Sequence, residues 1–288
     1  MSMELLQEKI RKLKNPSVVD LTVTVDQLPV HIFGGMDEIS AYELFCQNML
    51  EGLKGVVPAV RFSFDRFALM GSGGLELLAK LLRTARDDGF YVMLDGPQII
   101  SAANAAYGAD QLGTQYAYDA LVLSSYIGSD GMKPFVNAAK EQGSALFFVV
   151  RTANRSASEL QDLLTGSRHL YTAAADIVSR YAEGLVDRSG YSRIGLLCAA
   201  GAPTAVTELR KKYNRMFLLV DGIDTPSGNA KNASLAFDRL GHGAVICAST
   251  GITCAWQEAG TDGGDYVEQA MEAARRMQKN IWRYVTVI

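Results

Sequence analysis

Short apolar runs alternate with longer amphipathic stretches along nearly the whole chain. The runs are rich in Val, Ile, Leu and Phe and almost continuous, which is typical of parallel strands buried on both faces. Strands that alternate with helices in this way predict an α/β fold with right-handed crossovers. The eight predicted strands are Val18–Val23, Val56–Phe64, Tyr91–Asp95, Ala120–Tyr126, Ala145–Thr152, Ile194–Ala200, Met216–Gly222 and Gly243–Ser249.

The number of these strands favours closure into a (β/α)8 TIM barrel, and a doubly wound open sheet is the structural alternative. An N-terminal helix is expected to precede the barrel. Residues Met1 to Lys14 are charged and amphipathic, with Leu5, Leu6, Ile10 and Leu13 on one helical face.

The segment between the fifth and sixth predicted strands, residues 155–193, is longer than one crossover needs. A capping box at Ser156–Glu159 predicts a helix over Ser156–Leu164, and a second helix is expected over His169–Gly184. Residues Asp265 to Tyr284 form the predicted closing helix. Because no Pro/Gly/Ser linker or low-complexity tract divides the chain, we expect one domain over residues 1–288.

Composition removes several classes of function. The formal net charge is −3, with both signs interspersed, so we expect no nucleic-acid binding. There is no apolar run long enough to span a membrane and no signal peptide, so a cytoplasmic location is the default. No Walker loop, Rossmann glycine fingerprint or Ser-His-Asp arrangement is present, and no cofactor is expected.

Cysteine spacing gives no metal motif. Cys46, Cys198, Cys247 and Cys254 form no C-x-x-C pair, and two of them lie within apolar runs. A buried thiol acts there as a small hydrophobic group, with a disulfide or a zinc site as the alternative.

Chemistry in a barrel is expected at the carboxyl ends of the strands. Arg61 and Asp95 end the second and third predicted strands, so their side chains are expected to meet, either in a structural ion pair or as catalytic groups that bind a ligand. The remaining strand ends supply ligand-binding candidates, namely Thr22, Ser124, Ser125, Arg151, Thr152, Asp221, Ser249 and Thr250.

Two glycine-containing loops follow the seventh and eighth predicted strands, where barrels often hold phosphate. Gly222 begins the first loop, and Ser249-Thr250-Gly251 forms the second. Backbone N–H groups there could hold a phosphate, but Asp221 and Asp224 would repel it. Ordinary tight turns and a cation site at the two carboxylates are the alternatives.

The order of segments resembles the longer bacterial orotidine 5'-phosphate decarboxylases over nearly the whole chain. The stretches that carry the resemblance are Asn15-Pro16-Ser17-Val18-Val19-Asp20-Leu21 with Gln27-Leu28-Pro29, Tyr91-Val92-Met93-Leu94-Asp95, Asp119-Ala120-Leu121-Val122-Leu123, Arg151-Thr152-Ala153-Asn154 with Glu159-Leu160-Gln161, and Phe217-Leu218-Leu219-Val220 with Gly222 and the later Ala236-Phe237-Asp238 and Gly243-Ala244-Val245. The resemblance implies a carboxy-lyase of pyrimidine biosynthesis that binds a nucleotide or sugar phosphate.

The catalytic residues that the resemblance implies are largely replaced. The family uses a lysine on the second strand and a D-x-K-x-x-D motif after the third, whose lysine protonates the developing carbanion. Here Asp95 is kept, but Pro97 and Ile100 stand at the lysine and second carboxylate positions, and Arg61 replaces the strand lysine. No lysine lies between Asp95 and Lys133, so a shifted alignment does not restore the motif.

The ligand contacts that the resemblance implies are also changed. Thr22 replaces an aspartate, Ala153 a serine near the pyrimidine, and Thr250 the phosphate-binding arginine, whereas Ser249 and Gly251 remain. The glutamine of the family's phosphate loop has no clear counterpart. These losses predict a diverged member without ordinary decarboxylase activity.

Three functional hypotheses follow: a catalytically silent barrel that binds a small ligand or partner, an enzyme with changed chemistry at the same strand ends, and an active decarboxylase with an unrecognised proton donor. The resemblance further implies a homodimer. The loop Pro97-Gln98-Ile99-Ile100-Ser101, more apolar than its family counterpart, fits such an interface, with packing inside one chain as the alternative.

Overall fold

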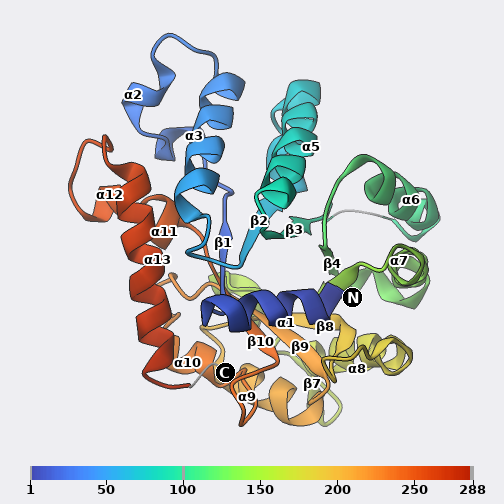
Figure 1. Ribbon diagram of the computed structural model, residues 1–288. Coiled ribbons are helices and arrows are strands. Elements are labelled where there is room, and N and C mark those ends of the chain that lie inside the picture. Colours follow the sequence, from blue (N-terminus) through green and yellow to red (C-terminus); the bar gives the residue numbers. More distant parts are fainter. Residues whose placement is uncertain (1, 99–100, 286–288) are drawn as a thin grey trace.

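The computed structural model describes residues 2–98 and 101–285, which form a closed barrel of eight parallel strands (Figure 1). The strand order β1-β10-β9-β8-β5-β4-β3-β2 closes through the pairing of β1 with β2, so the (β/α)8 TIM barrel prediction is confirmed. The barrel strands are β1 (Ser17–Asp20), β2 (Ala59–Ser63), β3 (Tyr91–Asp95), β4 (Ala120–Ser124), β5 (Ala145–Val149), β8 (Ser192–Ala199), β9 (Met216–Asp221) and β10 (Ala244–Ala248).

Helices connect the strands on the outside of the barrel, and one further helix precedes it (Figure 1). The helices are α1 (Ser2–Leu13), α2 (Val30–Phe33), α3 (Glu38–Leu53), α4 (Phe64–Ala68), α5 (Gly71–Asp87), α6 (Ala105–Gln115), α7 (Gly128–Gln142), α8 (Leu170–Ala182), α9 (Pro203–Lys212), α10 (Ala230–Ser234), α11 (Thr250–Thr253), α12 (Ala255–Glu258) and α13 (Tyr266–Trp282). None of them, within the described ranges, is long and apolar enough to cross a membrane.

Two hydrophobic cores follow from the alternation of side chains along each strand. One set of positions, including Val60 and Leu121, packs beneath the surrounding helices. The alternate set, including Ala59, Met93 and Phe147, fills the inside of the barrel. Because both faces of each strand are buried, the strands read in the sequence as nearly continuous apolar runs.

Helix α1 closes the amino end of the barrel, where Met3, Leu6 and Ile10 join the inner core. The Ser2 hydroxyl lies 2.8 Å from the Tyr91 hydroxyl, which ties the helix to the start of β3. The N-terminal helix was therefore predicted correctly, and Leu6 and Ile10 of its predicted apolar face are buried, together with Met3, whereas Leu5 and Leu13 are only partly buried. Because α1 seals this end of the barrel, a ligand would bind at the opposite, carboxyl end.

The predicted helix Ser156–Leu164 is wrong. The chain forms a 3-10 helix over Arg155–Glu159 and then a small hairpin, β6 (Leu164–Thr165) with β7 (Arg168–His169). The Gln161 side chain accepts a hydrogen bond from the Thr152 backbone N–H (2.8 Å), and this tertiary contact outweighs the local capping signal. The second predicted helix corresponds to α8.

Candidate functional site

Polar side chains from five of the strands belong to the last inward-facing layer at the carboxyl end of the barrel. Val18, Ala59, Met93, Leu219 and Cys247 belong to the inner core, and the residue two positions after each also faces inward. Those next positions are Asp20, Arg61, Asp95, Asp221 and Ser249. The layer combines four residues predicted from strand ends with one, Asp20, that was not predicted.

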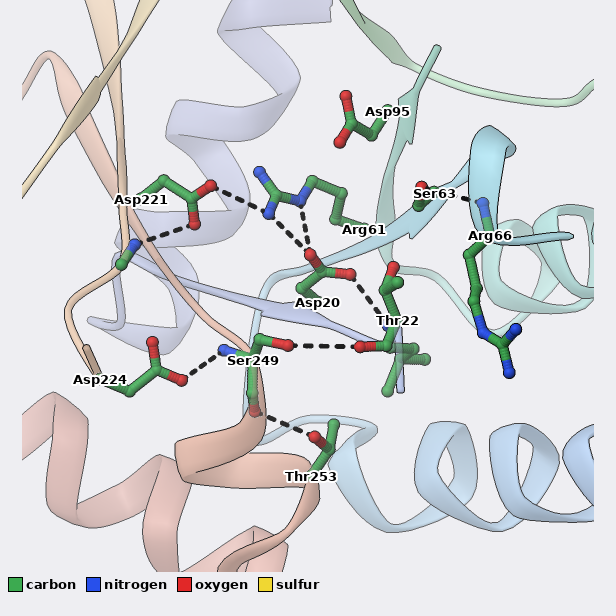
Figure 2. A network of polar contacts seen from close by, with 12 residues as sticks. Asp20, Thr22, Arg61, Ser63, Arg66, Asp95, Asp221, Asp224, Ser249 and Thr253 are labelled. Carbon is green, nitrogen blue, oxygen red and sulfur yellow. Dashed lines mark hydrogen bonds and ion pairs between the residues drawn. The ribbon is translucent and has the colours of Figure 1, made fainter. Parts of the chain in front are cut away.

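Arg61 is the centre of this layer (Figure 2). Its Nε and Nη2 atoms donate to Asp20 Oδ2 at 3.0 and 2.6 Å, and Nη2 also donates to Asp221 Oδ2 at 3.2 Å. Strands β2 and β9 are not neighbours in the barrel, so the guanidinium spans its mouth. The predicted direct pair of Arg61 with Asp95 is wrong, because Asp20 lies next to Arg61 in register and takes the guanidinium.

Asp95 has a different partner. Its Oδ1 accepts a hydrogen bond from Gln98 Nε2 at 2.8 Å, and the same amide donates to the Gly96 carbonyl at 3.1 Å. Burial raises the pKa of Asp95 to about 7, against the lowering effect of Arg61, and the neighbouring Asp20 and Asp221 charges add to the rise. Asp95 can therefore hold a proton near neutral pH.

Arg61, in contrast, cannot release a proton near neutral pH. Burial alone lowers the pKa of Arg61, but the charges of Asp20 and then Asp221 more than offset this and hold it well above its usual range. A guanidinium is already a very weak acid in water, and this environment makes proton donation harder still. Arg61 thus supplies fixed positive charge and no transferable proton.

Two buried polar atoms at the barrel mouth have no hydrogen-bond partner among the described residues, namely Arg61 Nη1 and Thr22 Oγ1. The whole Arg61 residue is only 5% exposed, so its free N–H groups are not satisfied by bulk water. An unpaired buried donor is costly, and a bound ligand that carries an acceptor would relieve that cost. These two atoms mark the barrel mouth as a binding position.

The loops after β9 and β10 are joined by Asp224 (Figure 2). Its Oδ2 atom accepts hydrogen bonds from the backbone N–H groups of Ser249 (2.7 Å) and Gly251 (2.9 Å). The Ser249 hydroxyl in turn donates to the Thr22 carbonyl at 3.4 Å. The amides that were predicted to hold a phosphate are therefore occupied by a side chain of the same chain.

The candidates after β4 and β5 hold the backbone in place. Arg151 forms a two-point ion pair with Asp162 (2.8 and 3.0 Å). The Thr152 hydroxyl donates to Asn154 Oδ1 at 2.6 Å. The buried Ser125 hydroxyl donates to the Val149 carbonyl at 2.7 Å, which ties the end of β4 to the end of β5.

Ser124 and Thr250 make no contact with Arg61 that would bring them into its network. The Ser124 hydroxyl accepts from the Tyr126 N–H at 3.2 Å, and the Thr250 side chain is exposed at the start of α11. Gly222 donates its N–H to Asp221 Oδ1 at 2.9 Å. The carboxyl strand ends thus divide into an Arg61 network and a set of residues that brace loops.

Neither aspartate of the suggested cation site is free to form one. Asp221 is engaged by Arg61 and the Gly222 N–H, and Asp224 by two backbone N–H groups. In the described ranges, no group of three or more His, Cys, Asp or Glu side chains is arranged to hold a metal ion. Ile99 and Ile100, which belong to the expected dimer loop, lie outside the described residues.

The sequence pattern does not single out Asp20, because the first predicted strand runs three residues too far, to Val23, whereas β1 ends at Asp20. A charged residue inside an apolar run is itself a signal, since buried charges need a partner. The sequence gives no comparable signal that Gln98 is the partner of Asp95, because the direction in which a loop side chain points cannot be read from its residue type.

Comparison with known proteins gives a consistent set of relatives. No family model matches the chain. The chain is 29% identical over 263 residues to the orotidine 5'-phosphate decarboxylase of Rhodopirellula baltica, covering 87% of each chain. It is 30% identical over 210 residues to that of Deinococcus radiodurans, covering 72% of this chain and 76% of the relative.

Solved structures show the same fold. The orotidine 5'-monophosphate decarboxylase of Plasmodium berghei superposes with a TM-score of 0.77 at 14% identity, covering 97% of this chain and 99% of that one. The OMP decarboxylase of Leishmania donovani gives a TM-score of 0.73 at 22% identity, covering 96% and 99%.

Proposed function

This chain belongs to the orotidine 5'-phosphate decarboxylase family, and we propose that it binds a small ligand at the barrel mouth without ordinary decarboxylation of orotidine 5'-phosphate. One observation carries the proposal: among the described side chains Asp20, Arg61, Asp95, Asp221 and Ser249 at the barrel mouth, the cation is Arg61, and two carboxylates already neutralise it. A carboxylate leaving as carbon dioxide requires a proton donor to the carbanion that remains. Arg61 is unsuited to that task.

The distribution of lysine supports the proposal. Every lysine of the chain lies within a helix or just after the C-terminus of one, and none ends a barrel strand. Preorganised charge together with a matched proton donor is usually the largest catalytic contribution of such a site. The absence of a lysine that combines positive charge with a transferable proton at a strand end corresponds to a loss on the order of 10³-fold or more in rate.

Ligand binding is supported by buried polar atoms at the barrel mouth that lack a hydrogen-bond partner. Arg61 Nη1 and Thr22 Oγ1 are buried without a partner in the described part of the chain, and Asp95 beside them has a pKa of about 7. Together they offer one donor, one hydroxyl and one group that donates or accepts according to pH. A small polar ligand with a carbonyl or ring-nitrogen acceptor fits this set.

A second candidate function, an enzyme with changed chemistry, is favoured by Asp95 alone. A buried carboxyl group whose pKa lies near the working pH suits general acid or base catalysis. In that case Arg61 would hold developing negative charge and Asp95 would move the proton.

Assembly as a homodimer is also part of the proposal. The exposed side chain of Tyr107, 71% accessible on α6, follows the loop that the resemblance assigns to the interface. A large aromatic side chain this exposed is common at protein–protein contacts. Light scattering of the purified chain is expected to give twice the monomer mass, and a monomer at micromolar concentration would remove this part of the proposal.

The catalytic part is tested by steady-state release of carbon dioxide from orotidine 5'-phosphate, with the Rhodopirellula baltica relative assayed beside it. We expect kcat/KM for this chain to be lower by about 10³-fold or more. A value within tenfold of the relative would overturn the proposal.

A further inference from the structure

The carboxylate of Asp224 lies between the loops after β9 and β10. Asp224 Oδ2 receives both the Ser249 N–H (2.7 Å) and the Gly251 N–H (2.9 Å). Two convergent backbone N–H groups at this position of a barrel are a common way to hold a phosphate oxygen. Here a carboxylate oxygen makes the contacts that a phosphate oxygen would make.

The surrounding backbone is shaped to accept this contact. A Cβ atom on Gly251 would lie 2.7 Å from Asp224 Cβ, so only glycine lets the carboxylate approach. The loop that carries Asp224 is compact, since the Thr225 hydroxyl donates to the Gly222 carbonyl at 2.7 Å. A Cβ on Gly228 would lie 2.0 Å from the same carbonyl oxygen. Asp224 is therefore held in place from both loops.

The charges near the two amides also oppose a phosphate. Asp221 lies three residues before Asp224 and faces Arg61, so negative charge is present on both sides of Gly222. Thr250, between the two donating residues, brings no positive charge. Arg276 of α13 lines the same hollow of 360 Å³ as Asp224, but it is paired with Glu272 at 3.7 Å. Among the described residues that line this hollow, Arg276 is the one cation against Asp224 and Glu258, and it is exposed and shared with Glu272, so a dianion placed here would meet more negative than positive charge.

We infer that Asp224 is a specificity-determining residue that occupies the anion position between the two loops, so that the ligand of this barrel carries no phosphate group at that position. The inference rests on the proposed ligand-binding function and narrows its ligand class.

The test is calorimetric titration of the full chain with inorganic phosphate. Wild-type protein is expected to show no binding in the millimolar range, whereas Asp224→Ala frees both amides and is expected to bind phosphate at least about tenfold more tightly. Asp224→Asn removes the charge but keeps an acceptor oxygen, so its gain is expected to be smaller. It also serves as the second variant if Asp224→Ala does not fold, which circular dichroism reports.

The matched control is Asp262→Ala, because Asp262 also accepts a backbone N–H in an exposed loop, that of Gly264 at 2.9 Å, without touching the Ser249 and Gly251 amides. It is expected to behave as wild type. Phosphate binding by the wild type that equals that of Asp224→Ala overturns the inference, and so does a lack of gain in both Asp224 variants. Carbon dioxide release is measured separately, so wild-type phosphate binding without turnover would overturn this inference and leave the proposed function standing.

Discussion

We expect Asp95→Asn to remove a pH dependence of the free energy of unfolding whose sign follows from the structure. Burial, the largest cause, raises the pKa of Asp95 from 3.8 to about 7, so between these values the folded chain keeps a proton that the unfolded chain has released. Folding stability therefore falls as the pH rises through this window and is constant above it. Asparagine has a similar shape and does not titrate, so the variant lacks this loss.

The magnitude follows from the size of the window. One pH unit over which a whole proton is taken up corresponds to about 1.4 kcal/mol. Between pH 5 and pH 8 the native protein is expected to lose about 2 to 3 kcal/mol relative to Asp95→Asn, because the proton is fully held at pH 5 and almost fully released at pH 8. Gln98 can still donate to the asparagine oxygen, so the local contact survives.

Urea unfolding of both proteins at pH 5, 6, 7 and 8 measures this difference directly. Asp262→Asn is the control, since this exposed carboxylate lies away from the Arg61 network and its difference from the native protein is expected to stay constant. A constant difference for Asp95→Asn over the same range would mean that the pKa of Asp95 is not raised and that Asp95 is ionised throughout.

Two further substitutions test the contacts of the site. Arg61→Met leaves the carboxylates of Asp20 and Asp221 without their cation and is expected to lower the free energy of unfolding by about 3 to 5 kcal/mol, whereas Arg61→Lys is expected to lower it less. A loss below about 1 kcal/mol in urea unfolding would mean that these ion pairs do not stabilise the fold. Gly251→Ala forces a Cβ atom against Asp224 Cβ at 2.7 Å and is expected to lower the melting temperature through a cost of about 1 to 3 kcal/mol, and an unchanged melting temperature would show that Asp224 is not held there.

The fold could be predicted from the sequence because the barrel buries both faces of every strand. Val60 and Phe62 pack under helices while Ala59 fills the barrel, so β2 reads as one apolar run despite its alternation. The helix predicted over Ser156–Leu164 failed for a tertiary reason. Gln161 bonds to the Thr152 backbone, a contact that no local pattern records.

The candidate site was only partly predictable. The alternation within a strand, applied from correct strand ends, places Asp20 beside Arg61, and the error lay in the position of one strand end. The path of Asp224 to the Ser249 and Gly251 amides depends on two loops that meet only in the folded chain. The sequence places Asp221 and Asp224 where they would repel a phosphate. The fold adds that Asp224 itself occupies the amides that a phosphate would use.

Arg61, held by Asp20 and Asp221, is proposed not to replace the missing proton donor. A single-turnover experiment, with protein in excess over orotidine 5'-phosphate, tests it most directly because product release then plays no part. We expect native protein and Arg61→Met to release carbon dioxide at the same background rate. Release that depends on the native protein and is abolished in Arg61→Met, with circular dichroism showing that the variant is folded, would mean that Arg61 supports the reaction.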